Sequence, residues 1–327
     1  MSSGIDDLMR GYAGAVPGAS VLVVHSGVSV VRRAYGLANV EEGIAATPAT
    51  NYRLASLTKQ FTAAAILLLA QERHLGLDDP VRKWLPTLPE ATRAITVRHL
   101  LTHTSGLIDY EDVIPGSMTF RLRDADVLAI LETQERTYFA PGANYRYSNS
   151  GYALLALIVE SASGRAFASF LHERMFRPLE MLNTVAHVDR RSTVVKRAFG
   201  YTETNGSWLR TDQDRTSAVL GDGGIYSSID DLAKWDTSLK NEQVLRAESL
   251  RSAFAPATYT DDPAVDYGFG WRISGETVWH SGESIGFRNA IVRYPKRRLT
   301  VVILTNRNDG VPYRLALAIA GLYPNGL

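Results

Sequence analysis

Runs of β-branched residues near both ends of the chain predict strands. Ser20-Val21-Leu22-Val23-Val24 and Val28-Ser29-Val30-Val31 flank a short segment containing Ser26-Gly27, a pattern typical of a β-hairpin. Strand-like runs return over residues 268–273, 277–279, 287–294 and 299–304. A closing helix is expected from about 311 to 322. The two chain ends therefore both contribute strands.

The middle of the chain has helical patterns instead. Residues 56–74 form a predicted helix that is apolar on every side between Ala63 and Ala70, as expected for a buried helix. A second helix is expected from about 150 to 163, ending at Gly164, which suits a left-handed cap. We therefore expect an α+β fold, with one antiparallel sheet built from N- and C-terminal segments, flanked by helices, and an inserted, mostly helical lobe.

This pattern predicts a single catalytic domain over residues 1–327 with two lobes. The α/β lobe would comprise about 1–60 and 205–327, and the helical lobe about 61–204. A hydrophobic content of 45% and a charged content of 21% are ordinary for a globular protein with a sizeable core.

Charge and cysteine content narrow the possible functions. A net charge of +1 with dispersed basic residues predicts no nucleic-acid partner and no membrane surface. The chain has no cysteine, which excludes disulfides, thiolate metal sites and a cysteine nucleophile. The N-terminal residues lack a secretion-signal pattern, so we expect a cytoplasmic location. We expect no cofactor and no metal; the sequence leaves the oligomeric state open.

The segment Ser56-Leu57-Thr58-Lys59 opens the first buried helix. Positions i and i+3 lie on one side of a helix, so the Lys59 amine can reach the Ser56 hydroxyl. A serine becomes a good nucleophile when a base removes its proton, and burial against an apolar helix disfavours the charged ammonium. Alternatively, Ser56 caps the helix and Lys59 lies on its surface. Among six lysines, only Lys59 has a serine three positions earlier.

Two further segments carry candidate chemistry. Tyr147-Ser148-Asn149 follows the turn Pro141-Gly142, where a phenol and an amide could face one pocket, although the second helix could also use Asn149 as a cap. His280-Ser281-Gly282 ends a strand-like run. Gly282 would let a substrate approach the strand edge, and the next N–H, from Glu283, could hold an oxyanion.

The order of these motifs resembles the β-lactamase and penicillin-binding protein superfamily, most closely its class C and family VIII carboxylesterase branch. Flanking segments over 103–107, 223–228 and 231–232 are similar too, and the resemblance covers roughly residues 15–310. It implies a β-lactamase/transpeptidase-like fold and catalysis through an acyl-enzyme.

The resemblance also implies roles for individual residues. Ser56 would be the nucleophile, and Lys59 and Tyr147 the proton-transfer pair. Asn149 would orient the substrate. The other implied substrate-binding residues are His280, Ser281 and Gly282 at the pocket edge, and Glu283, whose N–H would form the oxyanion hole with that of Ser56. Phe120, Tyr110 and Trp235 could shape the acyl pocket.

Three other motifs are better explained by structural roles than by catalysis or ligand binding. Ser284 lies in a Gly-x-Ser-x-Gly pattern, but no histidine follows it to complete an α/β-hydrolase triad. His99 and His103 lack the glutamate of a zinc motif and fit a short helix ending in a turn. The glycine-rich residues 221–224 fit a turn beside the pocket.

The predicted substrate is a small ester or amide. Related enzymes usually have a lysine at position 280 that holds a substrate carboxylate, whereas His280 is largely neutral at pH 7 with a reference pKa of about 6.5. This favours a carboxylesterase for short acyl esters, with weak β-lactam turnover, although Arg288 could restore the charge. The alternatives are a D-amino-acid peptidase, a D,D-carboxypeptidase or a β-lactamase, and a penicillin-binding sensor or scaffold without turnover.

Overall fold

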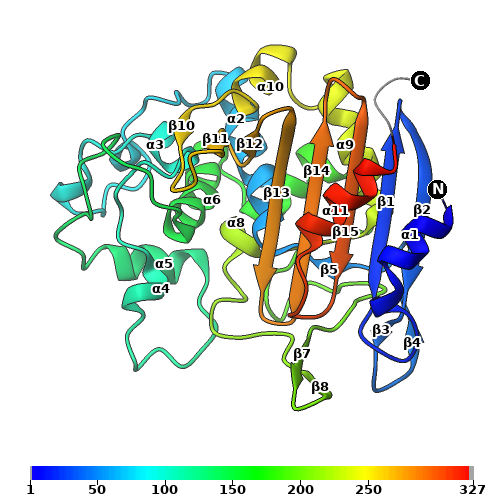
Figure 1. The fold of residues 1–327 in the computed structure, drawn as a ribbon. Helices are drawn as coiled ribbons and strands as arrows, with labels where there is room; N and C mark the ends of the chain where they lie inside the picture. The colour runs from blue at the N-terminus through cyan, green and yellow to red at the C-terminus, as the bar shows by residue number, and fades with distance from the viewer. Residues whose placement is uncertain (1, 324–327) are drawn as a thin grey trace.

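One eight-stranded antiparallel sheet dominates the computed structural model, which describes residues 2–323 (Figure 1). The spatial order is β10-β11-β12-β13-β14-β15-β1-β2, so the N-terminal hairpin pairs with the last strand of the chain. The strands are β1 (Ala19–His25), β2 (Val28–Tyr35), β10 (Thr258–Tyr259), β11 (Asp266–Tyr267), β12 (Arg272–Ser274), β13 (Thr277–Ser284), β14 (Phe287–Tyr294) and β15 (Leu299–Thr305). This confirms the expected sheet built from both chain ends.

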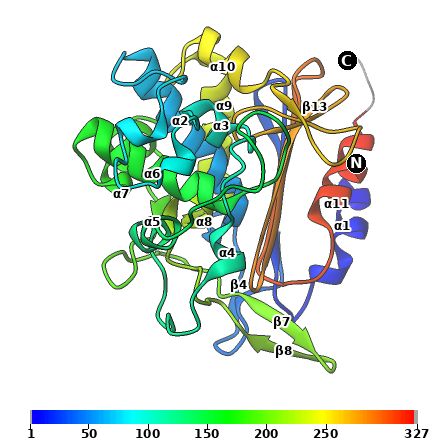
Figure 2. The same cartoon turned by 90° about the vertical axis from the view of Figure 1, so that its left-hand side faces the viewer.

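Both faces of the sheet are covered at its centre, as Figure 2 shows in an edge-on view. Leu22 and Val24 of β1 point into the larger core, shared with the helical part of the chain. Val21 and Val23 point into a second core beneath α1 (Ser2–Leu8) and α11 (Pro312–Gly321). Because both faces are buried, β1 is apolar at nearly every position and does not alternate.

The helical part packs against the inner face of the sheet around α2 (Lys59–Gln71) and α6 (Asn149–Ser163). The Ser148 hydroxyl accepts a hydrogen bond from Gly151 N at 3.2 Å and begins α6, and Gly164 ends it with φ 68°, as expected. The other helices are α3 (Val97–Leu101), α4 (Tyr110–Val113), α5 (Asp124–Leu131), α7 (Phe167–Leu171), the π-helix η5 (His172–Phe176), α8 (Leu220–Gly223), α9 (Ile229–Asn241) and α10 (Ala247–Ala253).

Short segments complete the fold. Three small sheets pair β3 (Leu37–Asn39) with β4 (Ile44–Ala45), β9 (Ile225–Ser227) with β5 (Tyr52–Arg53) and β6 (Val185–Ala186), and β7 (Tyr201–Thr204) with β8 (Ser207–Arg210). The 3₁₀ turns are η1 (Arg10–Tyr12), η2 (Ala55–Thr58), η3 (Val81–Lys83) and η4 (Glu90–Thr92). Within residues 2–323 no single helix is long and apolar enough to cross a membrane; the pair 149–163 and 167–176 qualifies only when joined across a 76° bend.

Two predicted elements differ in the structure. Ser56 lies in the 3₁₀ turn η2 rather than in the α-helix, which begins at Lys59. Residues 268–271 are not a strand, because Gly270 has φ +76° and packs so closely that a Cβ there would lie 2.7 Å from the Lys59 carbonyl oxygen. Strand β13 is longer than predicted and continues through Gly282 to Ser284.

Candidate active site

A sharp turn presents Ser56. Ala55 has φ 51°, a left-handed conformation that is uncommon for a residue with a Cβ and occurs often at functional sites. Leu54 N donates to Ile225 O at 2.8 Å, which anchors the turn to β9. Gly282 of β13 lies against the same turn, where a Cβ would be 2.2 Å from Leu54 O. Ser56 is partly exposed, while its neighbours in the turn are buried.

The Lys59 side chain is fully buried and reaches Ser56. Its Nζ lies 3.2 Å from Ser56 Oγ, 2.7 Å from Asn149 Oδ1 and 2.9 Å from the main-chain oxygen of Asp222. The amide and main-chain oxygens can only accept hydrogen bonds. A neutral amine would therefore donate its two hydrogens to them and direct its lone pair at the Ser56 hydroxyl, which is the arrangement that a general base requires.

Asn149 is held in one orientation by acidic residues of the helical part. Its Nδ2 donates to Glu111 Oε1 at 2.9 Å, so its Oδ1 must be the atom that faces Lys59. Its main-chain N donates to Asp109 Oδ2 at 2.8 Å. Both contacts fix the first residue of α6 beside the lysine.

Tyr147 lies over the lysine amine, with 4.9 Å between Lys59 Nζ and the ring centroid. His103 holds this loop: Ser148 N donates to its Nδ1 at 3.1 Å, and the rings of His103 and Tyr147 are 4.3 Å apart. Burial lowers the pKa of His103 well below its usual value, so the ring is neutral, as the Nδ1 acceptor role requires. Within residues 2–323 the half-buried Tyr147 hydroxyl has no hydrogen-bond partner.

Asp222 is a site residue that the sequence analysis missed. Its main-chain oxygen accepts from Lys59, while its carboxyl group accepts from the Tyr110 hydroxyl at 3.0 Å. Burial raises the pKa of Asp222 to about 8, so this carboxyl group is mainly protonated at neutral pH. The residue lies in α8, the short helix formed by the glycine-rich residues that were expected to make a turn.

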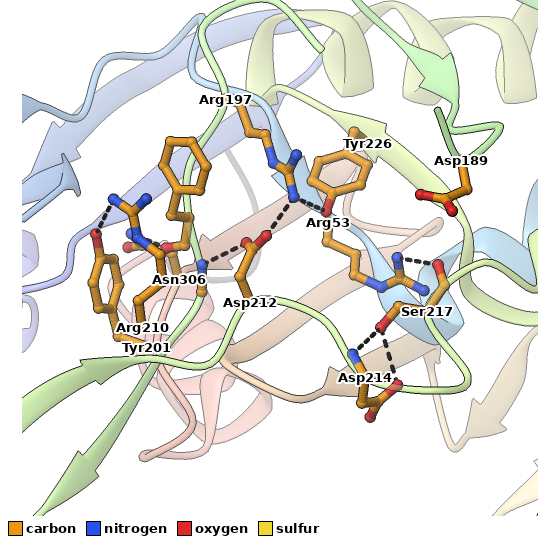
Figure 3. Close-up of polar contacts among 12 residues, drawn as sticks. Arg53, Asp189, Arg197, Tyr201, Arg210, Asp212, Asp214, Ser217, Tyr226 and Asn306 are labelled. Atoms are coloured by element: carbon orange, nitrogen blue, oxygen red, sulfur yellow. Dashed lines mark hydrogen bonds and ion pairs between the residues drawn. The ribbon is translucent and has the colours of Figure 1, made fainter. Parts of the chain in front are cut away.

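Two arginines, Arg53 and Arg197, hold the loop over residues 212–217 that precedes α8 (Figure 3). Arg53, buried and three residues before Ser56, donates from Nη1 to Ser217 O at 2.8 Å. Asp214 N donates to the Ser217 hydroxyl at 2.8 Å, and Arg197 forms an ion pair with Asp212. These contacts connect the strand that leads to the nucleophile turn with the loop that leads to Asp222.

The three positions of the third motif differ in their accessibility. The His280 side chain is buried; its Nδ1–H donates to Ser281 O at 2.6 Å, and its Nε2 accepts from the Tyr267 hydroxyl at 3.0 Å. Burial lowers the pKa of His280 well below its usual value, so the ring carries no charge at neutral pH. Ser281 is half-buried, Gly282 is buried and Glu283 is exposed.

Arg288 is held by contacts of its own, whereas Arg272 lies among the rings of Tyr147, Tyr267 and Trp279. The Arg288 guanidinium donates to the main-chain oxygens of Ser284 and Phe287, each at 3.2 Å, and lies 3.4 Å from Glu283 Oε2. The Arg272 guanidinium instead lies 5.6 Å from the Tyr147 ring centroid.

Within the described residues Arg272 makes no hydrogen bond or ion pair, and its Nε is shielded from solvent without a partner. It reaches the site because β12 pairs with β13 and places Arg272 opposite Trp279. This register cannot be read from the sequence.

Other predicted residues lie elsewhere. Trp235 is buried under α2, with its Nε1 donating to Gln60 Oε1 at 2.6 Å, and so cannot shape an acyl pocket at Ser56. Phe120 is 52% exposed. His99 accepts from Thr96 N at the start of α3, which confirms its structural role. No cluster of three or more metal-ligating side chains occurs among residues 2–323.

The sheet assembled from both chain ends, with the Ser-x-x-Lys turn facing the Tyr-x-Asn loop, defines a β-lactamase/transpeptidase-like fold. A family model described as Beta-lactamase matches residues 5–322, and the chain belongs to this family of hydrolases.

Similar proteins fall within the same superfamily. Penicillin-binding protein 4* of Bacillus subtilis (strain 168) is 32% identical over 317 residues, which cover 91% of this chain and 70% of the relative. A D-aminopeptidase of Gluconobacter oxydans (strain 621H) is 29% identical, and the match covers 93% of this chain and 58% of that protein. The chain therefore spans less than two thirds of this relative's length.

Solved structures agree on the fold. The octameric penicillin-binding protein homologue from Pyrococcus abyssi has a TM-score of 0.85 at 28% identity, covering 98% of this chain and 76% of that chain. EstCE1, a hydrolase with promiscuous acyltransferase activity, has a TM-score of 0.83 at 21% identity, covering 98% of this chain and 97% of that one.

Proposed function

We propose that this protein is a serine hydrolase that forms an acyl-enzyme on Ser56 and acts on small amides and esters with a free carboxylate, such as D-amino-acid peptides. The observation that carries the proposal is the position of Lys59, whose Nζ lies 3.2 Å from Ser56 Oγ and is held there by Asn149 Oδ1 and Asp222 O. Arg272 and the family relatives support the substrate class.

The first half of the reaction transfers the acyl group. Lys59 takes the Ser56 proton as Oγ attacks the substrate carbonyl carbon, and the carbonyl electron pair moves to oxygen. The N–H groups of Ser56 and Glu283 would hold this oxyanion. When the tetrahedral intermediate collapses, the bond to the leaving group breaks, and the leaving amine or alcohol takes a proton from Lys59 through the Tyr147 hydroxyl.

The second half releases the acid. A water molecule gives one proton to the Tyr147 and Lys59 pair and attacks the acyl carbonyl carbon. The bond to Ser56 Oγ then breaks, and the serine recovers its proton from Lys59. The Tyr147 hydroxyl has no hydrogen-bond partner in the part of the chain that the structure describes, and its ring lies beside the amine, so it is suited to relay these protons.

Arg272 is the basis for preferring anionic substrates. A neutral ester needs no cation. The Arg272 guanidinium, which contacts aromatic rings but forms no ion pair among residues 2–323, can form a charge-assisted hydrogen bond with a carboxylate. Hydrolysis of neutral short acyl esters is the second candidate, because His280 is uncharged where related enzymes have a lysine.

Two esters with the same leaving group separate these candidates. The anionic p-nitrophenyl hemiglutarate and the neutral p-nitrophenyl butyrate would be compared in the native chain, Arg272→Gln and Ser56→Ala. Arg272→Gln should lower kcat/KM about tenfold or more for the anionic ester, as loss of one charge-assisted bond implies. It should leave the neutral ester within about twofold. Equal losses for both esters would refute the role of Arg272.

The covalent mechanism is tested by the same variants. Ser56→Ala should reduce turnover of both esters by several orders of magnitude. Turnover that survives in Ser56→Ala and disappears in Ser284→Ala would overturn the assignment. A D-alanyl-D-alanine peptide and a chromogenic cephalosporin extend the comparison, and a burst of one equivalent without turnover would indicate a penicillin sensor.

A further inference from the structure

A cavity of about 560 Å³ lies among the helices and shares α8 with the candidate active site. This volume is within the range of small-molecule sites. Its walls come from the start of α5, from α6, α7, η5, β6 and the following loop, and from the start of α8. Both charged and apolar side chains line the cavity.

Two backbone features mark this cavity as more than a packing gap. His172, Glu173 and Phe176 line it from a π-helix, a rare conformation that is frequent at functional sites. In the loop after β6, Arg190 has φ 59° and lies in sequence between the lining residues Asp189 and Arg191. Left-handed backbone at a non-glycine residue also concentrates at ligand sites.

The acidic side chains that line the cavity are already paired, whereas the basic ones are not. Each carboxylate has a partner: Asp124 accepts from Leu220 N and Gly221 N at 3.0 and 2.9 Å, and Glu160 accepts from Phe167 N at 2.8 Å. Glu173 forms an ion pair with Arg165, and Asp189 with Arg121 at 2.6 Å. The acidic side chains are therefore not free to bind a cation.

The basic side chains have no such partners. Among residues 2–323, no hydrogen bond or ion pair engages the guanidinium groups of Arg123 and Arg191 or the imidazole of His172. The inner wall is apolar, formed by Leu157, Phe176, Ala186, Ala218 and Leu220. An occupant that matches both features has an apolar body and an anionic head.

We propose that this cavity binds a medium-chain carboxylate, with the chain against the apolar wall and the carboxylate on Arg123 and Arg191. The site is separate from Ser56 and Lys59, neither of which lines it. The two meet at α8, because Asp124 holds the first N–H groups of this helix and Asp222 of the same helix accepts from Lys59.

Calorimetric titration of the full chain with decanoate, and with decanol as the neutral analogue, tests the proposal. The Ser56→Ala variant serves as the parent, because it prevents turnover. The double variant Arg123→Glu/Arg191→Glu should weaken decanoate binding about tenfold or more, while decanol changes by less than about twofold. Both arginines are exposed, so the fold should tolerate these changes.

Matched variants locate the binding. Arg136→Glu/Arg251→Glu makes the same charge change at exposed positions outside the cavity and should leave the decanoate affinity within about twofold. Ala168→Trp, which fills the cavity from α7, should abolish binding of both ligands. Absence of saturable decanoate binding, or binding lost in Arg272→Gln and retained in Arg123→Glu/Arg191→Glu, would overturn the proposal.

Discussion

Replacing Gly282 with alanine should push strand β13 away from the turn that carries Ser56. The new Cβ would lie 2.2 Å from Leu54 O and 3.2 Å from Leu57 N, both main-chain atoms of the nucleophile turn. A comfortable carbon–oxygen contact is about 3.3 Å or longer, so β13 must move away from the turn by about 1 Å. Gly282 has ordinary extended geometry, so the contact alone is responsible.

The size of the effect follows from this displacement. Overpacking of this kind costs about 1–3 kcal/mol of unfolding free energy, and a 1 Å misplacement near the reacting groups costs about 100-fold in rate. The assays are urea unfolding and the rate at which a fluorophosphonate labels Ser56. Gly116→Ala is the matched control, because a Cβ at Gly116 meets nothing within 4 Å. Labelling of Gly282→Ala at the native rate with unchanged stability would refute this reasoning.

Three further predictions concern buried ionisable side chains. Burial raises the pKa of Asp222 to about 8, so its contribution to stability is complete below its unfolded pKa and is lost as pH rises through about 8. Asp222→Asn should therefore flatten the urea-unfolding stability between pH 5 and 9, where the native chain loses about 4 kcal/mol, at about 1.4 kcal/mol per pH unit up to pH 8. Arg293→Met should lower the free energy of unfolding by about 3 kcal/mol, because it removes the guanidinium that lies 2.9 Å from the buried Asp236 carboxylate. Adding Asp236→Leu should recover most of this loss, and a double variant no more stable than Arg293→Met would contradict the prediction. Asp124→Asn should cost about 1–3 kcal/mol and slow labelling of Ser56, since one amide oxygen replaces the two carboxylate oxygens that hold α8; unchanged labelling would show that α8 keeps its position without them.

Local patterns in the sequence predicted the elements that depend on local geometry. The hairpin at 19–36, the helix ending at Gly164 and the strand at 287–294 all have periodicity and turn residues that agree with the structure. The approach of Ser56 and Lys59 was also predictable, because residues three apart lie on one side of a helical turn, although Ser56 lies in a 3₁₀ turn and not in the α-helix.

The rest of the site depends on contacts between distant segments. Asp222 contributes a main-chain oxygen, which no side-chain motif reveals, and Arg272 reaches Tyr147 through the register of β12 on β13. Only residues 272–273 of the strand predicted at 268–273 are extended in the sheet, because Gly270 must pass close to the backbone of Lys59. Tertiary packing decided these positions against the local pattern.

The position of β1 between β15 and β2 has a consequence for synthesis of the protein. While the ribosome is still translating the middle of the chain, one edge of this apolar strand has no partner, because β15 follows only after the whole helical part of the sequence. Pairing over such a separation makes folding slow, and an exposed strand edge invites aggregation. Nascent chains should therefore depend on chaperones until residues 299–305 emerge, and truncation before them should yield insoluble protein.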